Sequence, residues 1–179
     1  NPFDRFAWAL DPHEFTGDPT KIVRLVAALT YRRRDARSDD FFDNTARSYL
    51  VLLVKILQSI KKDAWGWRTF YHLATSYDLL ERVVKASPLG RAKAGSIVKK
   101  TFAGVVATID SWLSEYESAF ACWERSPKLS LERFLRGRGI LIVSAPEDQI
   151  EVLRQIARLV LRVVKDRLLA DTGRDPRSS

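Results

Sequence analysis

Residues 40–62 have the sequence DFFDNTARSYLVLLVKILQSIKK, and this stretch indicates the fold class of the chain. Its apolar side chains recur every three or four residues, which places them on one face of an α-helix, while most charged side chains lie away from that face. The apolar face consists of Phe42, Ala46, Tyr49, Leu50, Leu53, Ile56, Leu57 and Ile60. We therefore expect a long amphipathic helix here, in a mainly helical domain.

Helical patterns continue on both sides of this stretch. Asp18 followed by Pro19 is a good helix start, because aspartate caps free backbone N–H groups and proline is tolerated in the first turn. Further helices are expected over residues 19–30, 67–74, 77–86, 96–125 and 130–133, and from Pro146 to about Leu169. Residues 1–18 look irregular, residues 87–90 are expected to form a turn, and the tail from Thr172 is polar and expected to be loose.

Residues 139–144, with the sequence GILIVS, depart from the helical pattern. A continuous aliphatic run bounded by glycine and proline is typical of a strand that is buried on both faces, as in a parallel sheet. One such strand cannot form a sheet by itself, so its partners are expected outside the chain, or the strand packs in a compromised way. This pattern indicates a helical domain inserted into an α/β core.

The composition favours a basic globular domain that contacts polyanions. Of the 179 residues 46% are apolar, which is enough for a core, and 30 Lys and Arg outnumber 22 Asp and Glu to give a net charge of +8. This charge favours nucleic acid, an acidic partner or an anionic membrane surface. The absence of methionine and of a signal peptide leads us to expect that both ends of the chain are cut points.

The sequence offers little for a disulfide, a metal site or a membrane span. Cys122 is the only cysteine, so no disulfide framework is possible, which fits a reducing compartment. His13 and His72 lie far apart in the sequence and have no evident co-ligands or catalytic partners. The longest apolar run, residues 49–54, is too short to cross a bilayer, so any membrane anchor is expected outside the chain.

Four segments, taken in order, resemble segments of a known family. They are NPFDR at residues 1–5 with Trp8, DFF at residues 40–42 with Ala46, Arg47 and LVLL at residues 50–53, LSLERFL at residues 129–135, and GILIVS at residues 139–144 followed by Asp148 and a helix. In this order and spacing they resemble the type IV secretion system coupling proteins, the conjugative DNA-transfer ATPases. Phe134 stands where a tryptophan is common in that family.

The resemblance implies a RecA-like α/β motor with a helical bundle inserted between its phosphate-binding loop and its Mg²⁺-binding acidic strand. Residues 1–18 would be the flank from the motor core, residues 19–136 the inserted all-α domain, and residues 137–179 a strand and helix that return to the motor core. The sequence contains neither a GxxxxGK[ST] loop nor a strand ending in Asp-Glu. By resemblance these parts lie before Asn1 and after Ser179. The chain itself is therefore expected to bind no cofactor and to hydrolyse no ATP, whereas its parent uses ATP and Mg²⁺.

Two groups of basic residues are the leading candidates for contacts with nucleic acid or a partner. The first group is Arg32, Arg33, Arg34 and Arg37 in a charged loop, and guanidinium forks suit phosphate oxygens. The second group is Arg91, Lys93, Lys99 and Lys100, which bracket Gly90 and Gly95 before a helix and suit an anion at the helix N-terminus. The alternative for both groups is an ordinary solvated surface, with Asp35, Asp39 and Asp40 neutralising part of the loop.

Two further patterns favour plain structural roles. Arg154, Arg158, Arg162 and Lys165 form a basic row opposite the apolar face of the last helix, where a solvated face with Glu151 and Asp166 as local partners is favoured over contact with nucleic acid or a neighbouring subunit. Trp65, Trp67, Phe70, Tyr71 and Tyr77 are expected in the core rather than stacked on bases.

Together these features predict a helical domain that receives the substrate of a coupling ATPase, contacting DNA or relaxosome and effector proteins at the entrance of a translocating ring. The parent is expected to be a bacterial hexamer at the cytoplasmic face of the inner membrane, with no direct membrane contact by this domain. Two alternatives stay open: a protein-docking adaptor that meets an acidic partner without touching DNA, and a stand-alone helix-turn-helix regulator that uses the helices at 67–74 and 77–86.

Overall fold

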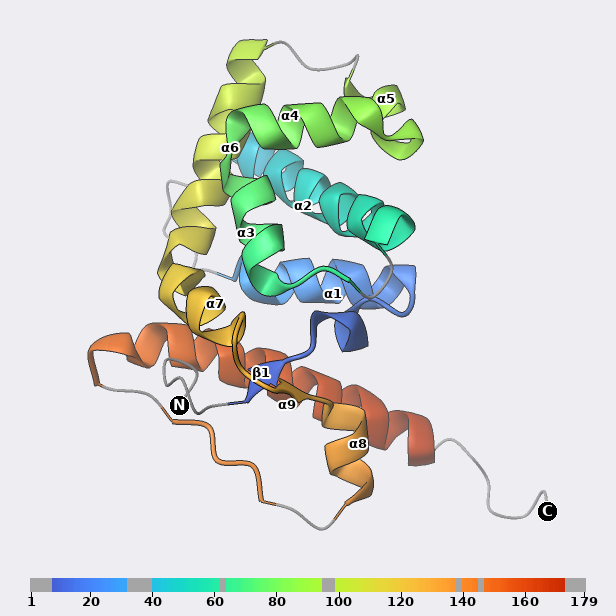
Figure 1. Ribbon diagram of the computed structural model, residues 1–179, viewed down its shortest axis with the longest axis vertical. Coiled ribbons are helices and arrows are strands. Elements are labelled where there is room, and N and C mark those ends of the chain that lie inside the picture. The colour runs from blue at the N-terminus through green and yellow to red at the C-terminus, as the bar shows by residue number, and fades with distance from the viewer. Residues whose placement is uncertain are drawn as a thin grey trace, which may run out of the picture.

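The computed structural model describes residues 8–31, 40–61, 64–94, 99–137, 140–144 and 147–172, which form a mainly helical domain (Figure 1). The α-helices are α1 (Pro19–Leu29), α2 (Asp40–Lys61), α3 (Trp67–Thr75), α4 (Tyr77–Ala86), α5 (Pro88–Ala94), α6 (Lys99–Leu113), α7 (Glu117–Trp123), α8 (Leu131–Arg136) and α9 (Ile150–Thr172). Short 3₁₀ helices are η1 (Pro12–Phe15), η2 (Ser114–Tyr116) and η3 (Glu147–Gln149), and the strands are β1 (Ala9–Leu10) and β2 (Lys128–Leu129). The predicted mainly helical class is confirmed, and α1 to α4 end within one residue of their predicted bounds.

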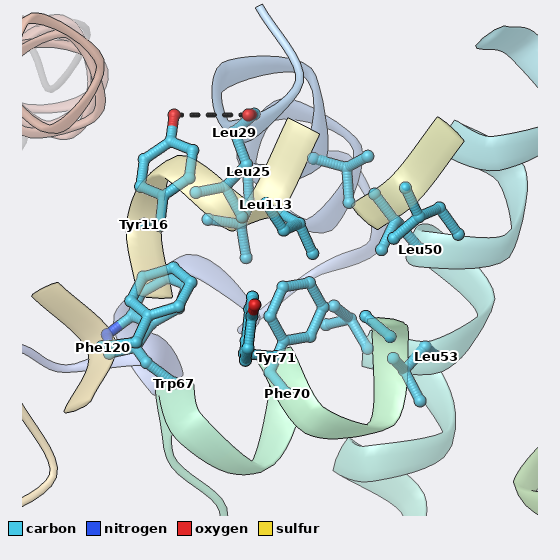
Figure 2. Packing of buried hydrophobic residues seen from close by; sticks show 14 of the residues in the cluster. Leu25, Leu29, Leu50, Leu53, Trp67, Phe70, Tyr71, Leu113, Tyr116 and Phe120 are labelled. Carbon is cyan, nitrogen blue, oxygen red and sulfur yellow. Dashed lines mark hydrogen bonds between the residues drawn. The ribbon is translucent and has the colours of Figure 1, made fainter. Parts of the chain in front are cut away.

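The bundle is assembled around the long helix α2, which packs against α1, α3, α4, α5 and α6. Its apolar face is buried at Tyr49, Leu50 and Leu53, as Figure 2 shows for the two leucines. The predicted face is confirmed except at its ends, because Phe42 is half-buried and Ile60 is exposed. Each fully buried large apolar side chain contributes about 1.5–3 kcal/mol, so this face supplies a large share of the driving force for folding.

Buried aromatic rings join α3 to η2 and α7 (Figure 2). The ring centroids of Trp67 and Phe120 lie 5.2 Å apart with the rings nearly parallel, and those of Tyr116 and Phe120 lie 5.5 Å apart in the same arrangement. The Tyr116 hydroxyl donates a hydrogen bond to the carbonyl of Leu29, at the end of α1, at 3.3 Å. The aromatic stack therefore connects three separate parts of the chain.

The prediction of one continuous helix over residues 96–125 is wrong. Helix α6 ends at Leu113, and the 3₁₀ turn η2 separates it from α7. Leu113, Tyr116 and Ala119 are all buried at a spacing of three residues, while Ser114 and Glu115 between them are exposed. A 3₁₀ turn has three residues per turn, so it keeps this period on one face better than an α-helix does.

Helix α5 forms where the sequence indicated a turn at residues 87–90. The Ser87 side-chain oxygen accepts a hydrogen bond from the N–H of Leu89 at 3.2 Å, and the Ser87 carbonyl accepts from the N–H of Gly90 and of Arg91, each at 3.0 Å. Ser87 thus acts as a helix cap rather than as a turn residue. Gly90 is buried against α4, and a Cβ placed on it would lie 2.1 Å from the Val84 carbonyl oxygen.

Residues 140–144 form no strand, although their sequence predicts a buried one. Ile140 and Ile142 are 90% and 76% exposed, whereas Leu141 packs partly against the core. A single strand has no partner for its backbone hydrogen bonds, and in the described chain β1 and β2 pair with each other and not with these residues. The last helix, predicted from Pro146, begins at Ile150 after η3, and Pro146 itself lies outside the described residues.

Strands β1 and β2 pair in parallel and form what we call the neck of the domain. The N–H of Ala9 donates to the Pro127 carbonyl at 2.9 Å, and the N–H of Asp11 donates to the Leu129 carbonyl at 3.3 Å. The Trp67 indole N–H donates to the Leu10 carbonyl at 2.7 Å and fixes the neck to the aromatic stack. Residues 1–18 were expected to be irregular, so β1 was not predicted. Strands of two residues are too short to show an alternation of apolar and polar side chains in the sequence.

Two segments that carry the family resemblance have structural roles. The Arg47 guanidinium lies 5.3 Å from the ring centroid of Trp112, and its Nε donates to the hydroxyl of Thr30 at 3.1 Å, so it connects α2 with α6 and α1. The carboxylate of Glu14 accepts a hydrogen bond from the Leu131 N–H at 2.7 Å, which joins η1 to the start of α8.

We predict that Gly90→Ala lowers the free energy of unfolding by about 1–3 kcal/mol, because the added methyl group must displace the α4 backbone. Urea unfolding followed by far-ultraviolet circular dichroism measures this change. Gly17→Ala is the matched control, since its Cβ would meet only the end of the Lys21 side chain at 3.9 Å. Equal stability of the two variants would contradict the close packing of α5 on α4.

We predict that Trp67→Phe lowers the free energy of unfolding by about 2–4 kcal/mol, because it removes buried volume and leaves the Leu10 carbonyl without its donor. The exposed Trp8→Phe, made in the same way, is expected to change it by less than about 0.5 kcal/mol. The same urea titration compares the two variants. A small effect at Trp67 would show that the neck does not depend on this hydrogen bond.

Candidate nucleic-acid interface

The first group of predicted contact residues, Arg32, Arg33, Arg34 and Arg37, lies outside the described residues. The chain that leads into it is described as far as Tyr31, directly after α1. The guanidinium carbon of Arg158 on α9 lies 4.3 Å from the ring centroid of Tyr31. The predicted arginine loop is therefore joined covalently to a residue that lies against α9.

The second group lies at the end of the molecule remote from the neck (Figure 1). Arg91 and Lys93 are on α5, and Lys99 and Lys100 are the first two residues of α6. Arg91 is exposed, and the side chains of the three lysines lie outside the described residues. The backbone thus brings all four positions to one end of the bundle, and their role as an anion site stays a prediction.

Sequence reasoning missed two cations at this end, Arg82 and Lys85 on the exposed face of α4. Lys85 forms an ion pair with Glu81 at 2.8 Å. Helix α4 packs closely against α5, which carries Arg91. We call the exposed side chains Leu79, Arg82, Lys85, Leu89 and Arg91 the distal surface. The polar face of the amphipathic pattern at residues 77–86 is the signal that would have identified its α4 members.

The five aromatic residues that were considered for base stacking lie in the core, as expected. Trp65, Trp67, Phe70 and Tyr71 are buried, and the half-buried Tyr77 packs against Phe102 with ring centroids 5.2 Å apart. Burial, reinforced by the nearby Glu117, raises the pKa of the Tyr71 hydroxyl, which therefore stays neutral over the physiological range. The faces of these rings are covered by protein and present no stacking platform.

The two histidines make structural contacts. His13 Nε2 lies 3.0 Å from the Trp65 carbonyl oxygen, and its ring meets the Trp65 ring edge-on. His72 lies on the exposed side of α3, where the Nε of Arg68 donates to its ring at 3.2 Å. Among the side chains that the structure describes, no three His, Cys, Asp or Glu residues gather as metal ligands.

A mainly apolar cavity of about 620 Å³ lies beside the neck and was not predicted from the sequence. Its walls come from the neck, α8, α9 and the irregular segment 140–143, and the aromatic side chains Trp8, Trp123 and Phe134 contribute to them. Lys128 and Arg133 are the basic residues in its lining. The signal for it in the sequence was the aliphatic run at 139–144, which was interpreted as a buried strand.

A search of the described helices for an apolar stretch long enough to span a bilayer finds none. The distal surface and the exposed basic residues of α9 instead present cations to solvent, an arrangement that suits phosphate groups.

No curated protein sequence and no solved structure matches the chain. The family described as the type IV secretion-system coupling protein DNA-binding domain matches residues 1–177, which is nearly the whole chain. The resemblance inferred from the four sequence segments is thereby confirmed, and the chain belongs to this family of type IV secretion-system coupling proteins, of which it represents the DNA-binding domain.

Proposed function

We propose that this domain receives the substrate of a coupling ATPase at the entrance of a translocating ring. The observation that carries the proposal is the opposite placement of the neck and the distal surface (Figure 1). If the neck joins the domain to a motor, as the resemblance implies, the distal surface points away from that motor. Residues 1–18 and 137–179 would then belong to the motor flanks and residues 19–136 to the inserted domain.

The contact residues in this proposal are the two predicted groups together with the distal surface. They are Arg32, Arg33, Arg34, Arg37, Arg91, Lys93, Lys99 and Lys100, with Arg82 and Lys85 added from the structure. A net charge of +8 supports binding to DNA phosphates, since most non-specific affinity for DNA comes from cations that displace counterions. The chemistry of the domain is thus electrostatic and steric.

ATP hydrolysis in this proposal belongs to the parent protein. The sequence contains no phosphate-binding loop, so we assign no residue of the chain to ATP or Mg²⁺. The parent would work as a hexamer at the cytoplasmic face of the bacterial inner membrane, and its motor would supply the force.

A protein-docking function is the second candidate, and the exposed Leu79 and Leu89 favour it. Apolar side chains beside cations suit an acidic, partly apolar segment of a relaxosome or effector protein better than they suit a phosphate backbone. The structure does not favour the helix-turn-helix alternative. Ser76 alone separates α3 from α4, whereas that motif uses a turn of three or four residues.

We predict that the chain binds labelled single- and double-stranded DNA in fluorescence anisotropy titrations, with an affinity that falls steeply as salt rises. The plot of log affinity against log salt has a negative slope. Replacing Arg82, Lys85 and Arg91 with glutamine is expected to reduce the magnitude of this slope by about 2–3 for duplex DNA, because three phosphate contacts are lost. A parallel variant with Arg32→Ala, Arg33→Ala and Arg34→Ala tests the loop in the same way.

The control replaces three exposed cations on other elements, Lys55, Arg68 and Arg125, with glutamine. It carries the same change in net charge and is expected to keep most of the slope. No DNA binding even at low salt would reject the DNA-receiving role of this chain. Binding of an acidic peptide that DNA does not displace would then favour the protein-docking function.

A further inference from the structure

Helix α9 carries a row of four exposed cations on the face turned away from the core. The row is Arg154, Arg158, Arg162 and Lys165, and we call it the α9 row. On the opposite face Val152, Ile156, Leu159 and Val160 are buried. With a rise of about 1.5 Å per residue, the cations of the row recur about every 4.5–6 Å and the row extends over roughly 17 Å.

The α9 row has few acidic neighbours along its own helix. Residues 152–165, VLRQIARLVLRVVK, contain no aspartate or glutamate. Glu151 pairs with Arg154 at the start of the row, and Asp166, whose side chain is not described, follows Lys165 at its end. An ordinary solvated helix face interleaves opposite charges at a spacing of three or four residues, as Glu81 and Lys85 do on α4. The middle of the α9 row departs from that arrangement.

Arg158 contacts an aromatic side chain of the segment that follows α1. Its guanidinium carbon lies 4.3 Å from the ring centroid of Tyr31, which is 50% exposed, and its Nη1 donates to the Gln155 side chain at 3.3 Å. A cation–π contact of this kind restrains the side chain while its charge stays open to solvent. Restraint before binding reduces the entropy that a contact with phosphate must overcome.

The α9 row and the distal surface lie at opposite ends of the domain. Figure 1 shows α9 crossing the end that holds the neck, with α4 and α5 at the other end. The two basic surfaces are therefore separate, and a ligand that contacts both must extend along the bundle.

We propose that the α9 row is a second DNA-binding surface, which contacts successive phosphates of one strand. The proposal rests on the proposed function, since it assumes that the chain binds DNA, and it names the helix that does so beside the neck. Evenly spaced like charges favour a phosphate backbone over an acidic protein segment, because phosphates recur regularly along a strand. Leu161, 65% exposed between Arg158 and Lys165, is the one large apolar side chain exposed beyond the first turn of α9 among those side chains of the helix that the structure describes.

The test measures the salt dependence of DNA affinity for a variant with Arg158→Gln, Arg162→Gln and Lys165→Gln. We expect the affinity at about 0.1 M salt to fall at least ~10-fold. We also expect the magnitude of the negative slope of log affinity against log salt to decrease by about 2–3. The control with Lys55→Gln, Arg68→Gln and Arg125→Gln carries the same charge change and is expected to behave like the unmodified chain. Circular dichroism and urea unfolding confirm that each variant is folded.

A crosslinking measurement locates the DNA without relying on affinity. In a Cys122→Ala background, Leu161→Cys is labelled with a benzophenone maleimide and irradiated with bound DNA. Ile60→Cys on α2 is the matched control, because Ile60 is also 65% exposed. We expect DNA crosslinks from position 161 in at least fivefold excess over position 60.

The outcomes separate this inference from the proposed function. If the unmodified chain binds no DNA, the proposed function and the inference both fail. If it binds DNA but the α9 variant keeps the full slope and position 161 gives no excess crosslinks, only the inference fails. If the α9 variant loses binding to a polyglutamate peptide while its DNA affinity is unchanged, the α9 row is a protein-docking surface and the inference is overturned.

Discussion

The arrangement of this domain depends on the contacts that the buried indole ring of Trp67 makes. One face of the ring stacks on Phe120, which in turn stacks on Tyr116, and the Tyr116 hydroxyl binds the end of α1. The indole N–H binds the Leu10 carbonyl in the neck. Trp67 thereby connects α3 directly with α7 and β1, and it connects α3 with α1 through Phe120 and Tyr116. An unpaired carbonyl at Leu10 would be costly in this buried setting, so the hydrogen bond also sets the orientation of the ring.

Two groups of exposed cations lie at opposite ends of this apolar core. The distal surface combines cations with exposed leucines, whereas the α9 row combines cations with the ring of Tyr31. Some of these cations are paired, Lys85 with Glu81 and Arg154 with Glu151, and elsewhere Arg68 pairs with Glu124 between α3 and α7. Surface pairs of this kind add little stability, so the placement of the unbalanced cations says more about binding than about folding.

The sequence predicted those parts of the structure whose pattern is local and long. Residues 40–61 and 77–86 form helices because their apolar spacing extends over several turns, and the family resemblance of the four segments is confirmed. The turn at Ser114–Tyr116 and the strand at Ala9–Leu10 were missed, because each depends on contacts with residues far away in the chain. The polar face of residues 77–86 could have identified Arg82 and Lys85 as exposed cations, but their position beside Arg91 depends on the packing of α4 on α5. The roles of Arg32 to Arg37 stay predictions.

The parallel pairing of β1 with β2 has a mechanical consequence. Strand β1 precedes helices α1 to α7 in the chain and β2 follows them, and the two strands run in the same direction. A pull on residue 8 in one direction and on residue 130 in the other therefore acts at opposite ends of the pair. Such a load shears the backbone hydrogen bonds together instead of unzipping them one at a time. A load applied between residues 8 and 130 would thus act on the neck hydrogen bonds before it reached helices α1 to α7.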